Sequence, residues 1–226
     1  VRFKFQNTSD RGNNIYIDDI NITGNVLDID ETDELQSGFA LYPNPSYGES
    51  TIQFGLNKNN HVIIEVKNIN SKESLQYFNA LNLDIIFSIA ASQIFKKDVL
   101  NIPKIGCFNI HTSKLPKNRG MMPNFWSLYN FESDSSSAVT IHKMNETLDD
   151  GEILLQKIFN LDSKETLDSL IRRTKKLSVI AFLEAIEILR TGNINYIVNN
   201  PKYATYNTFP TKDDVTRFKA KGYRLR

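Results

Sequence analysis

The pattern of apolar and polar residues changes character near residue 70. Before that point, short alternating segments are separated by Asn, Gly and Pro, a pattern typical of β-strands joined by turns. The candidate strands there are 15–17, 20–22, 51–54 and 62–66. After it, apolar runs alternate with segments of helical period, which favours an α/β fold. The sequence therefore predicts a β-rich segment over residues 1–68 and an α/β segment over residues 69–226.

The α/β segment contains four predicted strands and four predicted helices. Ser71 is a suitable N-cap for the first helix, and Gly192 is a suitable C-cap for the last. The run from Asp84 to Ile89 is apolar enough to be a buried strand of a parallel sheet. The predicted strands are 84–89, 106–111, 137–142 and 153–156, and the predicted helices are about 71–83, 93–100, 124–130 and 166–190.

Composition narrows the classes of function. The 27 basic and 26 acidic residues give a net charge of +1, which offers no electrostatic reason to bind nucleic acid or a membrane surface. The longest apolar run, residues 85–91, is far too short to span a bilayer. Cys107 is the single cysteine, so an internal disulfide is excluded, and its place in a buried strand favours a packed thiol.

The candidate chemistry is concentrated at the end of the second predicted strand of this segment. Asn109 and His111 are two residues apart, so on a strand they share one face. In α/β sheets, ligands bind beyond the carboxyl ends of strands. An amide and an imidazole can both donate hydrogen bonds to a developing oxyanion. A nearby carboxylate, from Asp149 or Asp150, would orient the imidazole or hold it protonated.

Two sequence blocks carry a specific resemblance. The first reads Gly106-Cys107-Phe108-Asn109-Ile110-His111-Thr112-Ser113-Lys114-Leu115-Pro116-Lys117-Asn118-Arg119-Gly120, and the second reads Leu148-Asp149-Asp150-Gly151-Glu152-Ile153-Leu154. Together they resemble the formyltransferases that use 10-formyltetrahydrofolate. The resemblance implies a Rossmann-like core and makes Asn109, His111 and Asp149 the catalytic residues. Asp149 matches better than Asp150 because it directly follows the apolar residue and precedes the glycine by two positions.

The resemblance also implies a binding site for the donor. The loop that follows the first strand would lie along 10-formyltetrahydrofolate, and the residues before Asp149 would offer backbone contacts to its pterin. The residues implied are Ser92, Gln93, Ile94, Phe95, Glu146, Thr147 and Leu148. In the implied mechanism, an acceptor amine attacks the formyl carbon, and Asn109 and protonated His111 stabilise the oxyanion, without metal. The acceptor is expected to be a small amine such as an amino sugar nucleotide, while the near-neutral charge disfavours methionyl-tRNA.

The first part of the chain suggests another origin. Phe39-Ala40-Leu41-Tyr42-Pro43-Asn44-Pro45-Ser46-Tyr47-Gly48 is similar to the start of the C-terminal sorting domain of type IX secretion substrates. That resemblance implies secretion, whereas the enzyme part implies the cytoplasm. No Gly-rich strand–turn–helix is found in residues 1–70, so we expect a formyltransferase core that lacks its first half, joined as a chimera between about Glu65 and Glu73. The loss of that half is expected to leave the acceptor side of the site open and to impair formyl transfer. The alternative function is a secreted β-rich sorting or interaction fragment fused to an inactive formyltransferase remnant.

Overall fold

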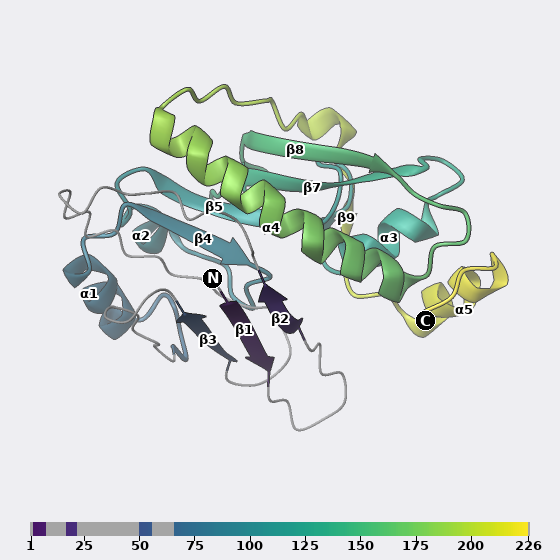
Figure 1. The fold of residues 1–226 in the computed structure, drawn as a ribbon, viewed down its shortest axis with the longest axis horizontal. Helices are drawn as coiled ribbons and strands as arrows, with labels where there is room; N and C mark the ends of the chain where they lie inside the picture. The colour runs from purple at the N-terminus through teal and green to yellow at the C-terminus, as the bar shows by residue number, and fades with distance from the viewer. Residues whose placement is uncertain (1, 8–16, 22–49, 56–65, 226) are drawn as a thin grey trace. The chain divides into compact units, whose positions relative to one another are not determined.

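The structure is a computed structural model that describes residues 2–7, 17–21, 50–55 and 66–225. The chain divides into two compact units, residues 1–107 and residues 108–226, shown in Figure 1. The boundary falls within one strand, after Cys107.

The first unit begins with a three-stranded antiparallel sheet in the order β2-β1-β3. Its strands are β1 (Arg2–Asn7), β2 (Ile17–Asn21) and β3 (Ser50–Gly55). The predicted strand 51–54 is confirmed by β3, and β2 overlaps the two short strands predicted at 15–17 and 20–22. Strand β1 was not predicted. The sorting-domain resemblance at 39–48 and most of the predicted strand 62–66 lie outside the described residues.

The first unit continues with α1 (Lys72–Ala80), β4 (Ile85–Ile89) and α2 (Lys97–Leu100). The predicted N-cap is confirmed, because the Ser71 hydroxyl accepts a hydrogen bond from the Ser74 amide at 3.2 Å. Strand β4 is buried along most of its length, as its apolar composition predicted.

Helix α2 is shorter than the predicted helix 93–100, for a local reason. The Gln93 side chain accepts a hydrogen bond from the Ile69 amide at 2.9 Å and donates one to the Lys67 carbonyl at 2.8 Å. These bonds hold the chain near Gln93 in an irregular loop against residues 67–70. The helix therefore begins only after Lys96, which is its N-cap residue.

The second unit contains the antiparallel strands β5 (Gly106–His111), β7 (Ser136–Lys143) and β8 (Ile153–Asn160). Within this unit the strands are hydrogen-bonded in the order β5-β7-β8. The sequence suggested a parallel sheet, but the pairings of β5 with β7 and of β7 with β8 are antiparallel. The loop of residues 144–152 returns the chain directly into the neighbouring strand, and such a short connection without a crossover helix joins antiparallel strands.

Helix α4 (Leu167–Thr191) lies across β7 and β8 (Figure 1). It starts at the N-cap Thr166 and ends at Gly192, whose φ of 71° gives the left-handed C-cap that the sequence predicted. The other elements of this unit are β6 (Arg119–Gly120), α3 (Pro123–Tyr129), the 3₁₀ turn η1 (Pro201–Tyr203), β9 (Tyr206–Asn207) and α5 (Lys212–Ala220). Strands β6 and β9 pair in parallel.

The polar C-terminal tail has a structural role that the sequence did not reveal. Phe218 of α5 is completely buried and stacks on Phe125 of α3, with ring centroids 4.7 Å apart. Burial of such a side chain stabilises the folded state by about 1.5–3 kcal/mol. The cluster also contains Leu128, Leu161, Leu167, Leu170 and Tyr223, with Trp126 packed against it. Phe125 and Leu128 thus give α3 its buried face.

Two further sequence predictions concern chemistry and membranes. Cys107 is buried, and this burial raises the pKa of its thiol to about 12, so the prediction of a packed rather than reactive thiol is confirmed. Within the described residues, every helix is too short or too polar to cross a bilayer.

Candidate active site

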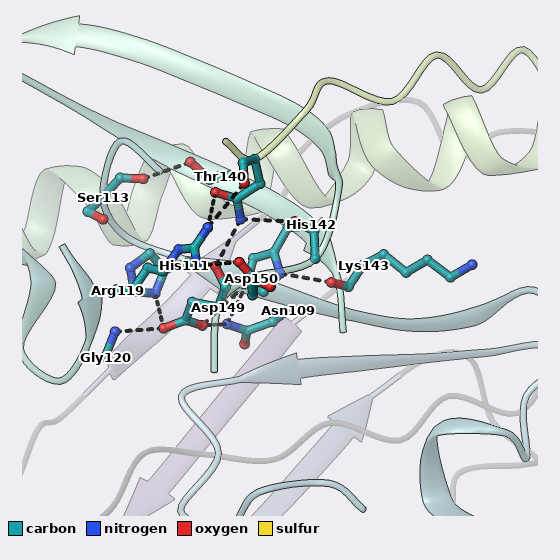
Figure 2. Close-up of polar contacts among 12 residues, drawn as sticks. Asn109, His111, Ser113, Arg119, Gly120, Thr140, His142, Lys143, Asp149 and Asp150 are labelled. Atoms are coloured by element: carbon teal, nitrogen blue, oxygen red, sulfur yellow. Dashed lines mark hydrogen bonds and ion pairs between the residues drawn. The ribbon is translucent and has the colours of Figure 1, made fainter. Parts of the chain in front are cut away.

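In the second unit, three polar side chains surround the carboxylate of Asp149. We call these four residues the Asp149 cluster: Asn109, His111, His142 and Asp149 (Figure 2). The Asn109 amide donates to Asp149 Oδ1 at 3.2 Å. His111 Nδ1 lies 3.6 Å from Asp149 Oδ2, and His142 Nε2 lies 3.4 Å from Asp149 Oδ1. Asn109 is half-buried, whereas the other three side chains are buried.

Strand register explains why three of these side chains meet. Asn109 and His111 stand two residues apart on β5, and their common contact with Asp149 confirms that they share a face. His142 stands directly opposite Asn109 on the antiparallel strand β7. The two side chains touch, since Asn109 Nδ2 lies 3.2 Å from His142 Nε2.

The loop between β7 and β8 brings Asp149 to the cluster. Asp149 has a φ of 51°, in the left-handed region that Asp adopts more readily than most residues. Two residues later, Gly151 passes so close to Lys143 that an added Cβ would collide with the Lys143 carbonyl. The Gly120 amide donates to Asp149 Oδ2 at 2.8 Å. The glycine of the second sequence block thus allows the tight turn, and Gly120 of the first block fixes the carboxylate.

His111 is held at both ring nitrogens. Nε2 lies 2.8 Å from the Asn118 carbonyl, which only accepts hydrogen bonds, so Nε2 carries a proton and donates. Nδ1 faces Asp149. Burial lowers the pKa of His111 below its ordinary value, an effect that the Asp149 charge and the Asn118 carbonyl only partly oppose. The resting ring is therefore neutral near pH 7, which differs from the sequence-based expectation of a protonated His111.

Asp149 is ionised at neutral pH. Burial alone would raise the pKa of this carboxyl, but a charge on His111, the hydrogen bond and charge of His142, and the Gly120 amide together bring the pKa below its ordinary range. The contribution of His111 requires a protonated ring, in conflict with the lowered pKa of His111 itself. We favour an ionised Asp149 beside a neutral His111, because the Gly120 bond does not depend on the charge of His111.

The residues predicted to bind the donor lie in two loops. Ser92 and Ile94 are exposed, Phe95 is 1% exposed, and the Gln93 amide is already bonded to backbone of residues 67–69. These four belong to the first unit. Glu146, Thr147 and Leu148 are exposed in the β7–β8 loop of the second unit. The structure therefore brings Asn109, His111 and Asp149 together, and the donor-binding role of the other seven residues stays a prediction.

Asp150 has a different role from its neighbour. It forms an ion pair with Arg119, which is completely buried and also donates to the Tyr206 hydroxyl at 2.7 Å. This outcome agrees with the preference for Asp149 as the catalytic carboxylate. The contacts of Arg119 with Asp150 and Tyr206 hold this loop in place.

The two motif blocks do not include His142, which stands in the cluster, or Asn199, whose side chain donates to the Asp149 and Gly151 carbonyls. The pairing of β5 with β7 was the signal that could have placed His142 beside Asn109. Asn199 lies in an irregular segment, and nothing in its local sequence marks it. In the described part of the chain, His, Cys, Asp and Glu side chains form no group of three or more able to hold a metal ion.

Comparison with known proteins places this geometry in a family. The family model described as formyl transferase matches residues 49–186. The methionyl-tRNA formyltransferase of Thermotoga maritima is 39% identical over 152 residues, which are 67% of this chain and 48% of that protein. The bifunctional polymyxin resistance protein ArnA of Wigglesworthia glossinidia brevipalpis is 36% identical over 140 residues, 62% of this chain and 21% of that protein. The chain thus spans about half the length, or less, of these curated relatives.

Solved structures give the same result. The formyltransferase PseJ from Anoxybacillus kamchatkensis, solved with a UDP-linked formamido sugar and tetrahydrofolate, shares 32% identity and a TM-score of 0.52, covering 60% of this chain and 68% of that one. A sugar N-formyltransferase from Shewanella shares the fold at 23% identity and a TM-score of 0.56, covering 68% of this chain and 65% of that one. The extent of the family match and the likeness to PseJ together show that this chain belongs to the formyltransferase family.

Proposed function

We propose that this chain transfers the formyl group of 10-formyltetrahydrofolate to the amine of a small acceptor. The observation that carries the proposal is that Asn109 and His111 both contact the buried carboxylate of Asp149. PseJ, the relative solved with tetrahydrofolate, supports a folate donor. The proposal covers the whole reaction, although the chain spans about half the length of its curated relatives.

Asn109 is the group that we propose contacts the formyl oxygen. Asn109 is half-buried, whereas the other three residues of the Asp149 cluster are buried. When the amine attacks, negative charge develops on the formyl oxygen, and an amide N–H can stabilise it. The Asn109 bonds to Asp149 and His142 are both 3.2 Å long. The formyl oxygen therefore competes for the Asn109 N–H groups with relatively long hydrogen bonds.

The pair formed by Asp149 and His111 takes up the proton that the attacking amine loses. The resting pair carries one negative charge and no exchangeable proton on Nδ1, because the ring is neutral and its proton is on Nε2. A proton gained by the pair gives an imidazolium 3.6 Å from a carboxylate. This attraction stabilises the proton until the bond between the formyl carbon and N10 of the folate breaks; the proton then passes to N10, and tetrahydrofolate leaves. Acid–base assistance of this kind contributes about 10²–10⁴ in rate.

The acceptor that we propose is an amino sugar nucleotide. PseJ was solved with a UDP-linked formamido sugar, and the net charge of +1 gives this chain no general affinity for a polyanion such as tRNA. Methionyl-tRNA is the second acceptor to test, because the Thermotoga maritima relative is 39% identical.

The experiment supplies 10-formyltetrahydrofolate with a UDP- or dTDP-linked amino sugar, and in parallel with methionyl-tRNA. Formylated product is measured by mass spectrometry and tetrahydrofolate by chromatography. We expect the wild-type chain to form both products with the amino sugar, and Asn109→Ala to form about 10²–10³-fold less. Equal product from the wild type and Asn109→Ala would refute the proposal.

A binding measurement separates this function from that of an inactive formyltransferase remnant. A non-reactive formyl folate at 100 times its dissociation constant should stabilise the folded chain by about 2.7 kcal/mol. The expected result is a rise in melting temperature, measured by scanning calorimetry. A chain with no donor site would melt at the same temperature with and without the folate.

A further inference from the structure

Asn199 uses its whole side chain to hold the backbone around Asp149. Its Nδ2 donates to the Asp149 carbonyl at 2.9 Å and to the Gly151 carbonyl at 3.0 Å. Its Oδ1 accepts a hydrogen bond from Arg119 Nη2 at 2.8 Å. The side chain is 5% exposed. Both amide protons therefore bind the backbone of one turn, and the carbonyl oxygen binds Arg119 beside it.

The turn held in this way has an unfavourable backbone conformation. Asp149 has a positive φ of 51°, which costs a non-glycine residue of order 1–3 kcal/mol and persists only when its surroundings enforce it. Asn199 bonds to the carbonyls on either side of Asp150, and the Asp150 side chain is paired with Arg119. The turn is thus held at three successive residues, through the backbone of Asp149 and Gly151 and through the side chain of Asp150.

The same contacts connect this turn to the C-terminal segment. Arg119 Nη1 also donates to the Tyr206 hydroxyl on β9 at 2.7 Å, and the Arg119 amide donates to the Thr205 carbonyl at 2.8 Å. Asn199 itself lies beyond residues 49–186, the range matched by the family model. The segment after α4 therefore reaches back to the carboxylate at the centre of the Asp149 cluster.

We propose that Asn199 is a positioning residue, which holds the Asp149 carboxylate against His111 and Asn109 by fixing the backbone of the Asp149 turn. This inference rests on the proposed formyl transfer for its kinetic consequence, but its geometric consequence does not require turnover. If Asn199 is lost, the Asp149 carboxylate moves away from His111, and the pKa of the His111 imidazole falls further. Misplacing a catalytic group by about 1 Å costs on the order of 10² in rate.

The test is Asn199→Ala in the full chain, with Asn200→Ala as the matched control. Asn200 is the exposed neighbour, and its side chain only accepts a hydrogen bond from the Lys202 amide. The first readout is the His111 titration by nuclear magnetic resonance, which is tractable because the chain has three histidines. The expected result is a lower His111 pKa in Asn199→Ala and an unchanged one in Asn200→Ala.

Other groups also act on His111, so the test is repeated in a second background. His142 and Arg119 lower the pKa of His111, and Asp149 raises it. If Asn199 acts through Asp149, then adding Asn199→Ala to Asp149→Asn leaves the His111 pKa where Asp149→Asn alone puts it. A further displacement in that background would overturn the proposal, because Asn199 would then act through Arg119 or through general loosening.

The kinetic readout is kcat separated from KM. Asn199→Ala should lower kcat about 10²-fold, with the KM for folate changed less than about threefold. A folded Asn199→Ala chain with wild-type His111 titration refutes the proposal. If that variant does not fold, Asn199→Ser, which retains one donor, is judged by the same criteria. If the wild type shows no turnover, formyl transfer fails while the titration still decides the role of Asn199.

Discussion

Replacing Asp149 by Asn removes the central charge of the cluster and keeps a side chain of similar shape. Asn can occupy the left-handed backbone conformation of residue 149 and can still accept the hydrogen bond from the Gly120 amide. Two unit charges at the 3.6 Å separation of His111 Nδ1 and Asp149 Oδ2 attract each other by about 4–5 kcal/mol at an effective dielectric constant near 20. This is the energy available to stabilise a proton on His111 while the amine is being formylated.

At about 1.4 kcal/mol per factor of ten, that attraction corresponds to about 10³ in kcat, within the range expected of acid–base assistance. We therefore expect Asp149→Asn to lower kcat about 10³-fold and to lower the His111 pKa, because Asp149 is the group that raises it. Steady-state kinetics and a histidine titration measure the two effects. Asp168→Asn is the control, because Asp168 is half exposed and pairs only with exposed Arg172.

Two outcomes would contradict this reasoning. An Asp149→Asn chain that is folded and retains kcat within about tenfold of the wild type would show that the carboxylate does not stabilise the proton. An unchanged His111 titration would show that the two groups do not interact electrostatically in solution. If Asp149→Asn loses both its activity and its fold, the His111 titration is measured instead in the Asn199→Ser chain, where Asp149 is retained.

Three more predictions follow from the geometry. Asn109→Ala should lower kcat about 10²–10³-fold, with little change in the KM for folate; a kcat equal to that of the wild type would exclude Asn109 as an oxyanion donor. The free energy of unfolding should fall as the pH drops below 6.5, the ordinary pKa of His, because unfolded His111 binds a proton that the buried ring resists. In denaturant titrations His111→Gln should lose less stability than the wild type between pH 6.5 and 5, and parallel curves would contradict the lowered pKa. Gly151→Ala should lower the free energy of unfolding by more than about 3 kcal/mol, since the new Cβ collides with the Lys143 carbonyl. Gly192→Ala, whose Cβ meets nothing, should lower it by about 1–2 kcal/mol because of its positive φ. Equal melting temperatures of the two variants would refute this prediction.

The elements that the sequence predicted best are those with a clear local signal. Ser71 and Gly192 mark the ends of two helices by capping chemistry, and both are confirmed. Strand β5 has the predicted bounds because a short apolar run is enclosed between Pro103 and the polar loop after His111. Each of these features depends on residues adjacent in sequence, so local reasoning was sufficient.

Features set by distant contacts could not be read in this way. Gln93 shortens α2 through hydrogen bonds to backbone 24 and 26 residues away. Phe218 gives α5 its place by stacking on Phe125, although the helix around it is polar. The antiparallel direction of β7 depends on how the chain returns after α3, and apolar composition does not distinguish it from a parallel strand.

The candidate site shows the same division. Asn109, His111 and Asp149 were identified by two motif blocks, and the structure brings them together. The neutral state of His111 required knowledge of its burial, which the sequence does not give. Asn199, which we propose positions Asp149, is 50 residues away from it in the chain, so only the folded structure reveals the contact.

The central claim is that the Asp149 cluster acts on a formyl group through Asn109. The most direct measurement is a crystal structure of this chain with a stable formyl folate whose formyl group is not transferable. We expect the formyl oxygen to lie at hydrogen-bonding distance, about 2.7–3.2 Å, from Asn109 Nδ2, with the formyl carbon open to an incoming amine. A folate bound with its formyl group away from Asn109, beyond the reach of the Asp149 cluster, would contradict the claim.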